Sequence, residues 1–301
     1  MDQTAEPSVP QDTVQQEKRR KSLLLRIVTG VGVIVVVSCV NFVPGSGLPF
    51  ALSVAVISII AASEFYRAVR KQGAEPSELL GLLACVLFQV EAWRRAGNTQ
   101  DPFLPAFLTL LILVTMLVEL VKPKQKPILN IGATLLGGIY CGWLFSFLVL
   151  LHGTHMLNYV PIAGTRPGQW LAFFVIGVTA ANDSGGLFVG NALGRHKLAP
   201  AISPAKTWEG AAGGAVLSII TAALIGRWIH LPLGPAIALG ALMAVAGLIG
   251  DLCESALKRE LKVKDFGVIL PGHGGILDRI DSILFTAPVA YYFLLILMNR
   301  Q

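Results

Sequence analysis

Apolar residues fall into runs of about 20, separated by shorter segments rich in charged residues, glycine and proline. A helix of about 20 apolar residues is long enough to cross a bilayer, so the pattern predicts membrane-spanning helices. Nine candidate spans are present, at residues 23–43, 48–66, 78–93, 103–121, 129–151, 169–193, 208–226, 232–250 and 277–298. The third is the weakest, because it is short and contains Glu91.

The composition supports the same conclusion. Hydrophobic residues make up 54% of the chain and charged residues only 14%, whereas a soluble domain carries roughly 25% charged residues. We therefore predict an all-α polytopic membrane protein with about nine transmembrane helices. The four cysteines are far apart and form no Cys-x-x-Cys pair, which argues against a zinc site or a disulfide framework.

The N-terminal 22 residues differ from the rest of the chain. They are polar, contain Pro7 and Pro10, and include the basic cluster Lys18–Lys21, a composition typical of disorder. The apolar run that follows is too long for the core of a signal peptide. We expect residues 1–22 to form a disordered tail and residues 23–301 to form a single transmembrane domain.

The basic residues predict an orientation. If the N-terminus is cytoplasmic and nine spans alternate, most of the 24 Lys and Arg residues lie on the cytoplasmic side, as is usual in membrane proteins. The net charge of +6 therefore needs no nucleic-acid partner. Orientation alone does not explain the last two cytoplasmic segments, residues 195–207 and 251–281, whose polar residues are varied and closely spaced.

The first half of the C-terminal segment has helical spacing. Asp251, Ser255, Lys258 and Lys262 fall on one helix face, with Arg259 beside them. A solvated amphipathic helix at the membrane surface would show the same pattern, and the charges alone leave that alternative open.

The second half of this segment points more clearly to chemistry. Residues 271–275 form a glycine-rich turn of the kind whose backbone N–H groups can hold phosphate oxygens. Asp278 and Asp281 follow at i, i+3 spacing, which places both on one side of the opening turn of the last span. Two such carboxylates, joined by Asp251, suit magnesium bound together with substrate phosphates. A structural ion pair of Asp278 with Arg279 or a neighbouring lysine is the alternative.

The earlier segment supplies a further acidic residue and several phosphate-binding types. Asp183 lies well within an apolar span, where ionisable residues are usually functional. Gly186, Gly190 and Gly194 have the spacing of close helix packing. The basic loop that follows contains Ser203 and Lys206, which suit a triphosphate or a lipid phosphate, although attraction to anionic lipid would also explain it.

Taken from the residues alone, the two cytoplasmic segments indicate phosphoryl or nucleotidyl transfer at the cytoplasmic membrane boundary. Which nucleotide is used stays open at this level. A transporter or lipid-binding protein without chemistry is the alternative from another class, and the acidic pair on one helix face argues against it.

The C-terminal motif resembles the phosphatidate cytidylyltransferase, or CDP-diacylglycerol synthase, family. The family pattern is Ser-x-apolar-Lys-Arg, four residues, Lys-Asp, and after a spacer His-Gly-Gly-x-x-Asp-Arg-x-Asp. Its fixed positions correspond here to Ser255, Leu257, Lys258, Arg259, Lys264, Asp265, His273, Gly274, Gly275, Asp278, Arg279 and Asp281. The segment 196–210 is similar as well, and Glu64–Tyr66 matches more weakly. Leu187 and Asn191 depart from the aromatic and basic residues often found in the family.

The resemblance implies that CTP and phosphatidate are converted into CDP-diacylglycerol and pyrophosphate, in phospholipid biosynthesis. It implies Mg²⁺ as cofactor, with a second cation left open, and the lipid bilayer as surroundings. A homodimer is compatible with it, and the compact length suggests the cytoplasmic (inner) membrane of a bacterium. A polyprenol kinase or an ether-lipid cytidylyltransferase is the nearest enzymatic alternative.

The resemblance also implies roles for individual residues. Asp251, Asp278 and Asp281 are expected to bind the metal, and Lys258, Arg259 and Lys264 to neutralise the triphosphate or departing pyrophosphate. Further substrate contacts are expected from Ser203, Lys206, Ser255, His273 and Asp183, the last of which is expected to support the metal or orient the base. Residues 23–301 are thus predicted to form a transmembrane catalytic domain.

Overall fold

The structure, a computed structural model, describes residues 37, 39–45, 47–95, 103–121, 125–154, 162–267 and 274–298. The predicted N-terminal tail and most of the first predicted span lie outside these residues, as do three members of the predicted glycine-rich turn, Pro271, Gly272 and His273.

The described part of the chain is almost entirely helical, as predicted. Its helices are α2 (Leu48–Arg70), α3 (Glu78–Arg95), α4 (Phe103–Val121), α5 (Pro127–Gly137), the π-helical turn η1 (Gly138–Trp143), α6 (Leu144–Gly153), α7 (Pro167–Leu193), α8 (Trp208–Trp228), α9 (Leu233–Glu260) and α10 (Leu277–Met298). Eight of the nine predicted spans coincide with these helices, because α5, η1 and α6 form one continuous segment.

Seven described segments are long and apolar enough to cross a membrane. Helix α3 is not among them, which agrees with its prediction as the weakest span and with the buried polar residues Gln89 and Glu91 that it carries. Helix α9 extends about three turns past its predicted end at residue 250, to Glu260, so the amphipathic segment after Asp251 continues the membrane helix without a break.

A short hairpin stands where the sequence predicted only a basic loop. Strand β1 (Lys197–Ala199) pairs antiparallel with β2 (Ser203–Thr207), with Lys197 opposite Thr207. The Thr207 side chain then accepts a hydrogen bond of 3.1 Å from the Gly210 N–H and caps the start of α8. The apolar spans gave no signal for this hairpin, because it is polar and only a few residues long.

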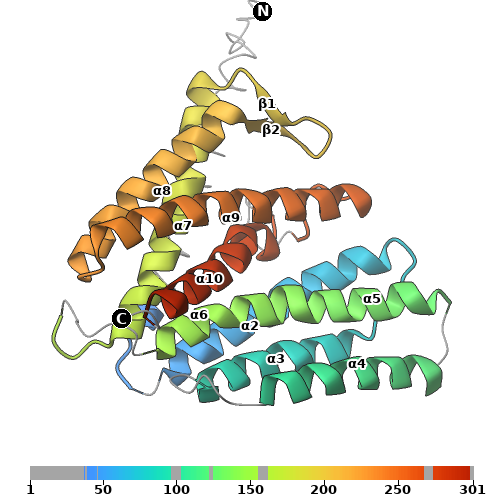
Figure 1. Cartoon of the computed structure of the whole chain (residues 1–301). Helices are drawn as coiled ribbons and strands as arrows, with labels where there is room; N and C mark the ends of the chain where they lie inside the picture. Colours follow the sequence, from blue (N-terminus) through green and yellow to red (C-terminus); the bar gives the residue numbers. More distant parts are fainter. Residues whose placement is uncertain are drawn as a thin grey trace, which may run out of the picture.

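Two groups of helices meet at α10. Helices α2 to α6 lie side by side in the lower part of Figure 1, while α7, α8 and α9 pack in succession and carry the hairpin at one end. Helix α10 contacts α9 and α7 on one side and α6 and α2 on the other. The last helix of the chain therefore joins the N-terminal group to the C-terminal group.

Tyr66 is a fixed point of the N-terminal group. It is fully buried, and its hydroxyl donates a hydrogen bond of 2.8 Å to the Thr134 carbonyl. Gly81 and Gly137 lie against its ring, and a Cβ at these glycines would come within 1.8 Å and 2.5 Å of Tyr66 atoms. Side chains larger than hydrogen at these two positions would displace α3 or α5 from α2.

Glycines allow α7 and α8 to approach closely, as the spacing of Gly186 and Gly190 predicted. A Cβ on Gly210 of α8 would lie 2.9 Å from the Gly186 carbonyl and 3.1 Å from the Gly190 Cα. Small residues permit such contact between membrane helices. The contact brings the C-terminal end of α7 beside Thr207, the last residue of the hairpin.

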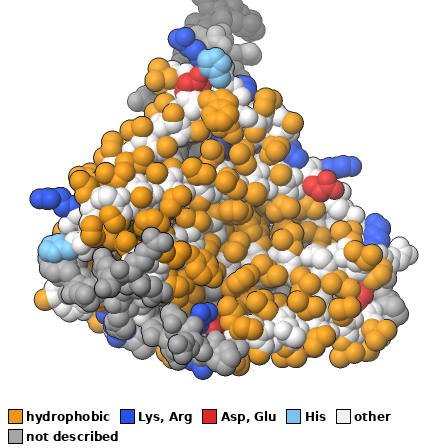
Figure 2. Space-filling model, viewed as in Figure 1, with side chains coloured by type: hydrophobic (Ala, Val, Ile, Leu, Met, Phe, Trp, Pro, Cys, Tyr) orange, Lys and Arg blue, Asp and Glu red, His pale blue; other side chains and the backbone are white. Residues whose placement is uncertain are grey.

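The outer surface of the helices is strongly apolar. Figure 2 shows hydrophobic side chains across most of the visible face. Leu120 of α4 is 77% exposed and Leu224 of α8 is 67% exposed, values that would be costly in water over so many residues. Together with the seven apolar spans, this surface identifies an integral membrane protein.

Candidate active site

A cavity of about 480 Å³ lies between α7, α8, α9, α10 and the hairpin. Seven of the predicted site residues line it: Asp183, Ser203, Lys206, Asp251, Lys258, Asp278 and Asp281. Of the other predicted residues, Ser255, Arg259 and Lys264 lie outside this lining, and His273 lies outside the described residues. Residues from two segments about 70 positions apart thus share one polar cavity, as the sequence predicted.

Three carboxylates reach the cavity from three helices, Asp183 from α7, Asp251 from α9 and Asp281 from α10. Ser282 donates its hydroxyl to Asp183 at 3.2 Å and its backbone N–H to Asp281 at 2.8 Å. Both Asp183 and Asp251 lie close enough to Asp281 for their negative charges to repel it. Like charges held together in this way favour a cation among them.

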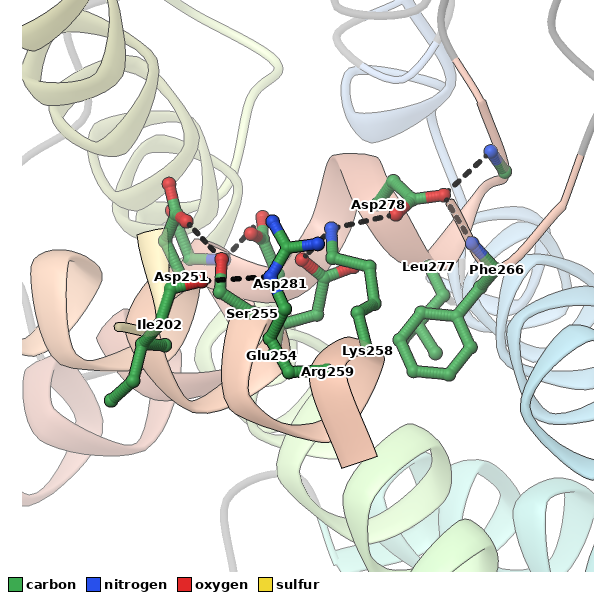
Figure 3. Close-up of polar contacts among 12 residues, drawn as sticks. Ile202, Asp251, Glu254, Ser255, Lys258, Arg259, Phe266, Leu277, Asp278 and Asp281 are labelled. Carbon is green, nitrogen blue, oxygen red and sulfur yellow. Dashed lines mark hydrogen bonds and ion pairs between the residues drawn. The ribbon is translucent and has the colours of Figure 1, made fainter. Parts of the chain in front are cut away.

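Lys258 joins two carboxylates on one side of the cavity (Figure 3). Its ammonium lies 2.5 Å from the Glu254 carboxylate, one turn earlier on α9, and 2.9 Å from the Asp278 carboxylate on α10. The Lys258 side chain is only 15% exposed, and Glu254 is 1% exposed. The ion pairs therefore lie in a largely dry environment and fix α9 against α10.

Asp278 has partners for both of its oxygens. Besides Lys258 on one oxygen, its other oxygen accepts hydrogen bonds from the Phe266 N–H at 3.0 Å and the Gly275 N–H at 2.8 Å (Figure 3). The bond to Lys258 is the structural ion pair that the sequence left open as an alternative for Asp278, with Lys258 as the neighbouring lysine. In this arrangement Asp278 holds the chain on both sides of residues 268–273.

The hairpin is attached to α9 at two points. Lys206 forms an ion pair with Asp251, and the Arg259 guanidinium donates a hydrogen bond of 3.0 Å to the Ile202 carbonyl. Arg259 thus supports the hairpin, although the sequence predicted that it would face the triphosphate. At the base of the hairpin, Glu209 accepts backbone N–H bonds from Arg195 and His196 at 3.1 to 3.3 Å.

The two positions that depart from the family pattern also belong to the cavity. Leu187 and Asn191 both line it, together with Ala244 and Leu248. The cavity therefore combines charged groups with an apolar part, to which Leu187 contributes from α7.

The donor set is chemically suited to a hard divalent cation, because it consists of carboxylate oxygens in mutual repulsion. Within the residues that the structure describes, no three Asp, Glu, His or Cys side chains lie close enough to hold one ion by themselves. This arrangement fits magnesium, which commonly binds one or two carboxylates and completes its shell with substrate phosphates and water.

Sequence reasoning missed two buried acids near the site. Glu254 precedes Lys258 by four residues, a spacing that predicts an ion pair on one helix face. Glu64 lies on α2 and accepts a hydrogen bond of 2.9 Å from the Leu277 N–H at the start of α10. The only signal for Glu64 was its weak match to the family, because a contact across 213 residues leaves no pattern in a single sequence.

Comparison with known proteins gives consistent matches along most of the chain. The profile of the cytidylyltransferase family matches residues 24–297. Phosphatidate cytidylyltransferase of Synechocystis is 34% identical over 84% of this chain and 90% of its own length, and that of Bacillus subtilis is 35% identical over 89% and 96%. The uncharacterized protein YnbB of Escherichia coli is 41% identical over a shorter match, 52% of each chain.

Proposed function

Because this chain belongs to the cytidylyltransferase family, we propose that it is a phosphatidate cytidylyltransferase. It transfers the cytidylyl group of CTP to phosphatidate and releases pyrophosphate. The observation that carries this proposal is the shared cavity, in which acidic and basic groups from α7, α9, α10 and the hairpin meet apolar residues within an integral membrane protein. Such a cavity suits a polyphosphate and a lipid at the same time.

The reaction forms one P–O bond and breaks another. An oxygen of the phosphatidate phosphate attacks the α-phosphorus of CTP, and the bond from that phosphorus to the β-phosphate oxygen breaks. Phosphate monoesters have a second pKa of about 6, so the attacking group is anionic near neutral pH and needs no strong base. Catalysis then rests on positioning and on neutralising charge, as in phosphoryl transfer generally.

The basic residues on the cavity provide that neutralisation. Lys206 and Arg279 line it from the hairpin and from α10, and Lys258 lines it from α9. Lys206 is the basic residue best placed to turn from its partner Asp251 to the triphosphate, because both side chains line the cavity. Lys258 is held between two buried acids and contributes mainly a fixed positive charge.

We propose Mg²⁺ as the cofactor, with Asp281 and Asp251 as its protein ligands and Asp183 beside them. When bound, it would draw together the phosphate oxygens and offset their negative charge. Asp278 remains a candidate ligand, but to act as one it would have to give up its bond to Lys258 or those to the backbone. The cytoplasmic membrane of a bacterium is the proposed location, with the cavity on the cytoplasmic side, where CTP is available.

The proposal is tested with purified protein in vesicles that contain phosphatidate, given CTP with and without Mg²⁺. Equal amounts of pyrophosphate and CDP-diacylglycerol are expected, and only with the cation. Release of CDP would instead indicate a lipid kinase. Intact CTP under all conditions would favour a transporter or lipid-binding protein, and a product formed only with ether lipids would indicate a different lipid substrate.

A further inference from the structure

Glu64 is a buried acid outside the cavity lining, yet it contacts the helix that carries Asp278 and Asp281. It lies near the C-terminal end of α2 and is 1% exposed. One of its carboxylate oxygens accepts a hydrogen bond of 2.9 Å from the backbone N–H of Leu277, the first residue of α10. The first N–H groups of a helix have no partner within the helix, so Glu64 caps α10 from another helix.

Two glycines surround this carboxylate. A Cβ on Gly267 would lie 2.0 Å from one Glu64 oxygen, and a Cβ on Gly275 would lie 2.4 Å from the other. Real Cβ atoms do not come this close to oxygen. Gly267 and Gly275 stand on either side of residues 268–273, so the carboxylate lies against the chain just before these residues and just before the start of α10.

Asp278 contacts the same two stretches. Its carboxylate accepts the N–H groups of Phe266 and Gly275. Two carboxylates, one from α2 and one from α10, thus hold residues 266–267 next to residues 275–277. Phe65, the neighbour of Glu64, adds an aromatic contact with Phe266, with ring centroids 6.1 Å apart.

From this geometry we infer that Glu64 is a positioning residue for the active site: its carboxylate fixes the first turn of α10 and so sets where Asp278 and Asp281 stand. It acts through backbone N–H groups and through van der Waals contact with Gly267 and Gly275. The catalytic part of this inference rests on the proposed function, whereas the structural part does not.

Hydrogen exchange on the full-length protein in detergent, without substrate, tests the structural part. Glu64→Ala removes the acceptor, and loss of a helix cap costs about 1 kcal/mol. The peptide covering residues 274–281 should then exchange about fivefold to tenfold faster than in the wild type. Glu64→Gln keeps an oxygen that can accept the Leu277 N–H, and its exchange should stay within about twofold of the wild type.

Glu119→Ala is the matched control. Glu119 is also a buried acid, 7% exposed, and accepts one hydrogen bond of 2.9 Å from Asn130, but it lies on α4, which packs on α3 and α5. Its loss should leave exchange at residues 274–281 unchanged. Wild-type exchange in Glu64→Ala, or equal acceleration in Glu119→Ala, would overturn the inference.

Activity measurements test the catalytic part. Glu64→Ala should lower kcat about tenfold or more and raise the Mg²⁺ concentration needed for half-maximal rate, while Glu64→Gln restores both to within about threefold. Equal loss in the two variants would overturn the positioning role, since it would mean that the charge itself takes part. Absence of any activity in the wild type would refute the proposed function and leave the exchange result to decide the structural role.

Discussion

Lys258→Met is the substitution for which the structure gives the clearest energetic expectation. The Lys258 ammonium is the shared partner of Glu254 and Asp278, whose side chains are 1% and 3% exposed. Methionine keeps the length and the apolar stem of lysine and removes only the charge. Two acids would then be left in a nearly dry environment without their common counter-ion.

The expected cost is about 3 kcal/mol of unfolding free energy. Removing one partner of a buried ion pair typically costs about 3–5 kcal/mol, because the remaining charge stays buried without compensation. The lower end applies here, since Lys258 is 15% exposed and Asp278 keeps two backbone N–H donors. The matched control is Lys262→Met, at an exposed position in the turn two residues past the end of α9, where a change of about 0.5 kcal/mol or less is expected.

Reversible unfolding in mixed micelles, followed by helical circular dichroism, measures both variants. The double variant Lys258→Met with Glu254→Met should recover about 1 kcal/mol or more of the loss, because one of the two stranded acids is also removed. If Lys258→Met were no more destabilising than Lys262→Met, the ion pairs would not hold α9 against α10, and the electrostatic account of the site would be wrong.

Two further substitutions test other parts of the site. Lys206→Met removes the ammonium group paired with Asp251. It should raise KM for CTP about tenfold, equivalent to about 1.4 kcal/mol, in steady-state assays of pyrophosphate release. An unchanged KM would exclude a contact between Lys206 and the triphosphate. Gly185→Val places a Cβ 2.8 Å from the Gly213 carbonyl and should destabilise the α7–α8 pair by about 1–3 kcal/mol in the same unfolding assay. Gly132→Val, where a Cβ meets nothing within 4 Å, should cost much less, and similar losses in both would contradict close packing at Gly185.

The spans could be read from the sequence because bilayer thickness sets a length that apolar residues must fill. The predicted ends mostly agree with the structure within a few residues, for example 208–226 against Trp208–Trp228. The prediction failed where that rule says nothing. The hairpin Lys197–Thr207 is polar and short. Helical spacing after Asp251 was predicted, but not that this segment continues the membrane helix α9 to Glu260 without a break.

Which residues share a helix face could be predicted from spacing, whereas contacts between helices could not. The spacing of Asp278 and Asp281, and of Asp251 and Lys258, gave their common face directly. The sequence could not show that Lys258 reaches Asp278 across 20 residues, or that Arg259 turns to the hairpin. Such pairings depend on how helices cross, and a single sequence carries no record of that geometry.

The described residues of the N-terminal half, none of which lines the polar cavity, have a physical role in the site. Helix α10 begins at the fully buried Leu277, and the first N–H groups of a helix have no acceptor within the helix. Glu64 of α2 provides an acceptor, and Tyr66, two residues later on α2, packs α2 against α3 and α5 at Gly81 and Gly137. Through the inferred role of Glu64, the packing of the N-terminal group bears on the positions of Asp278 and Asp281, in addition to the direct contacts of α10 with α6 and α2.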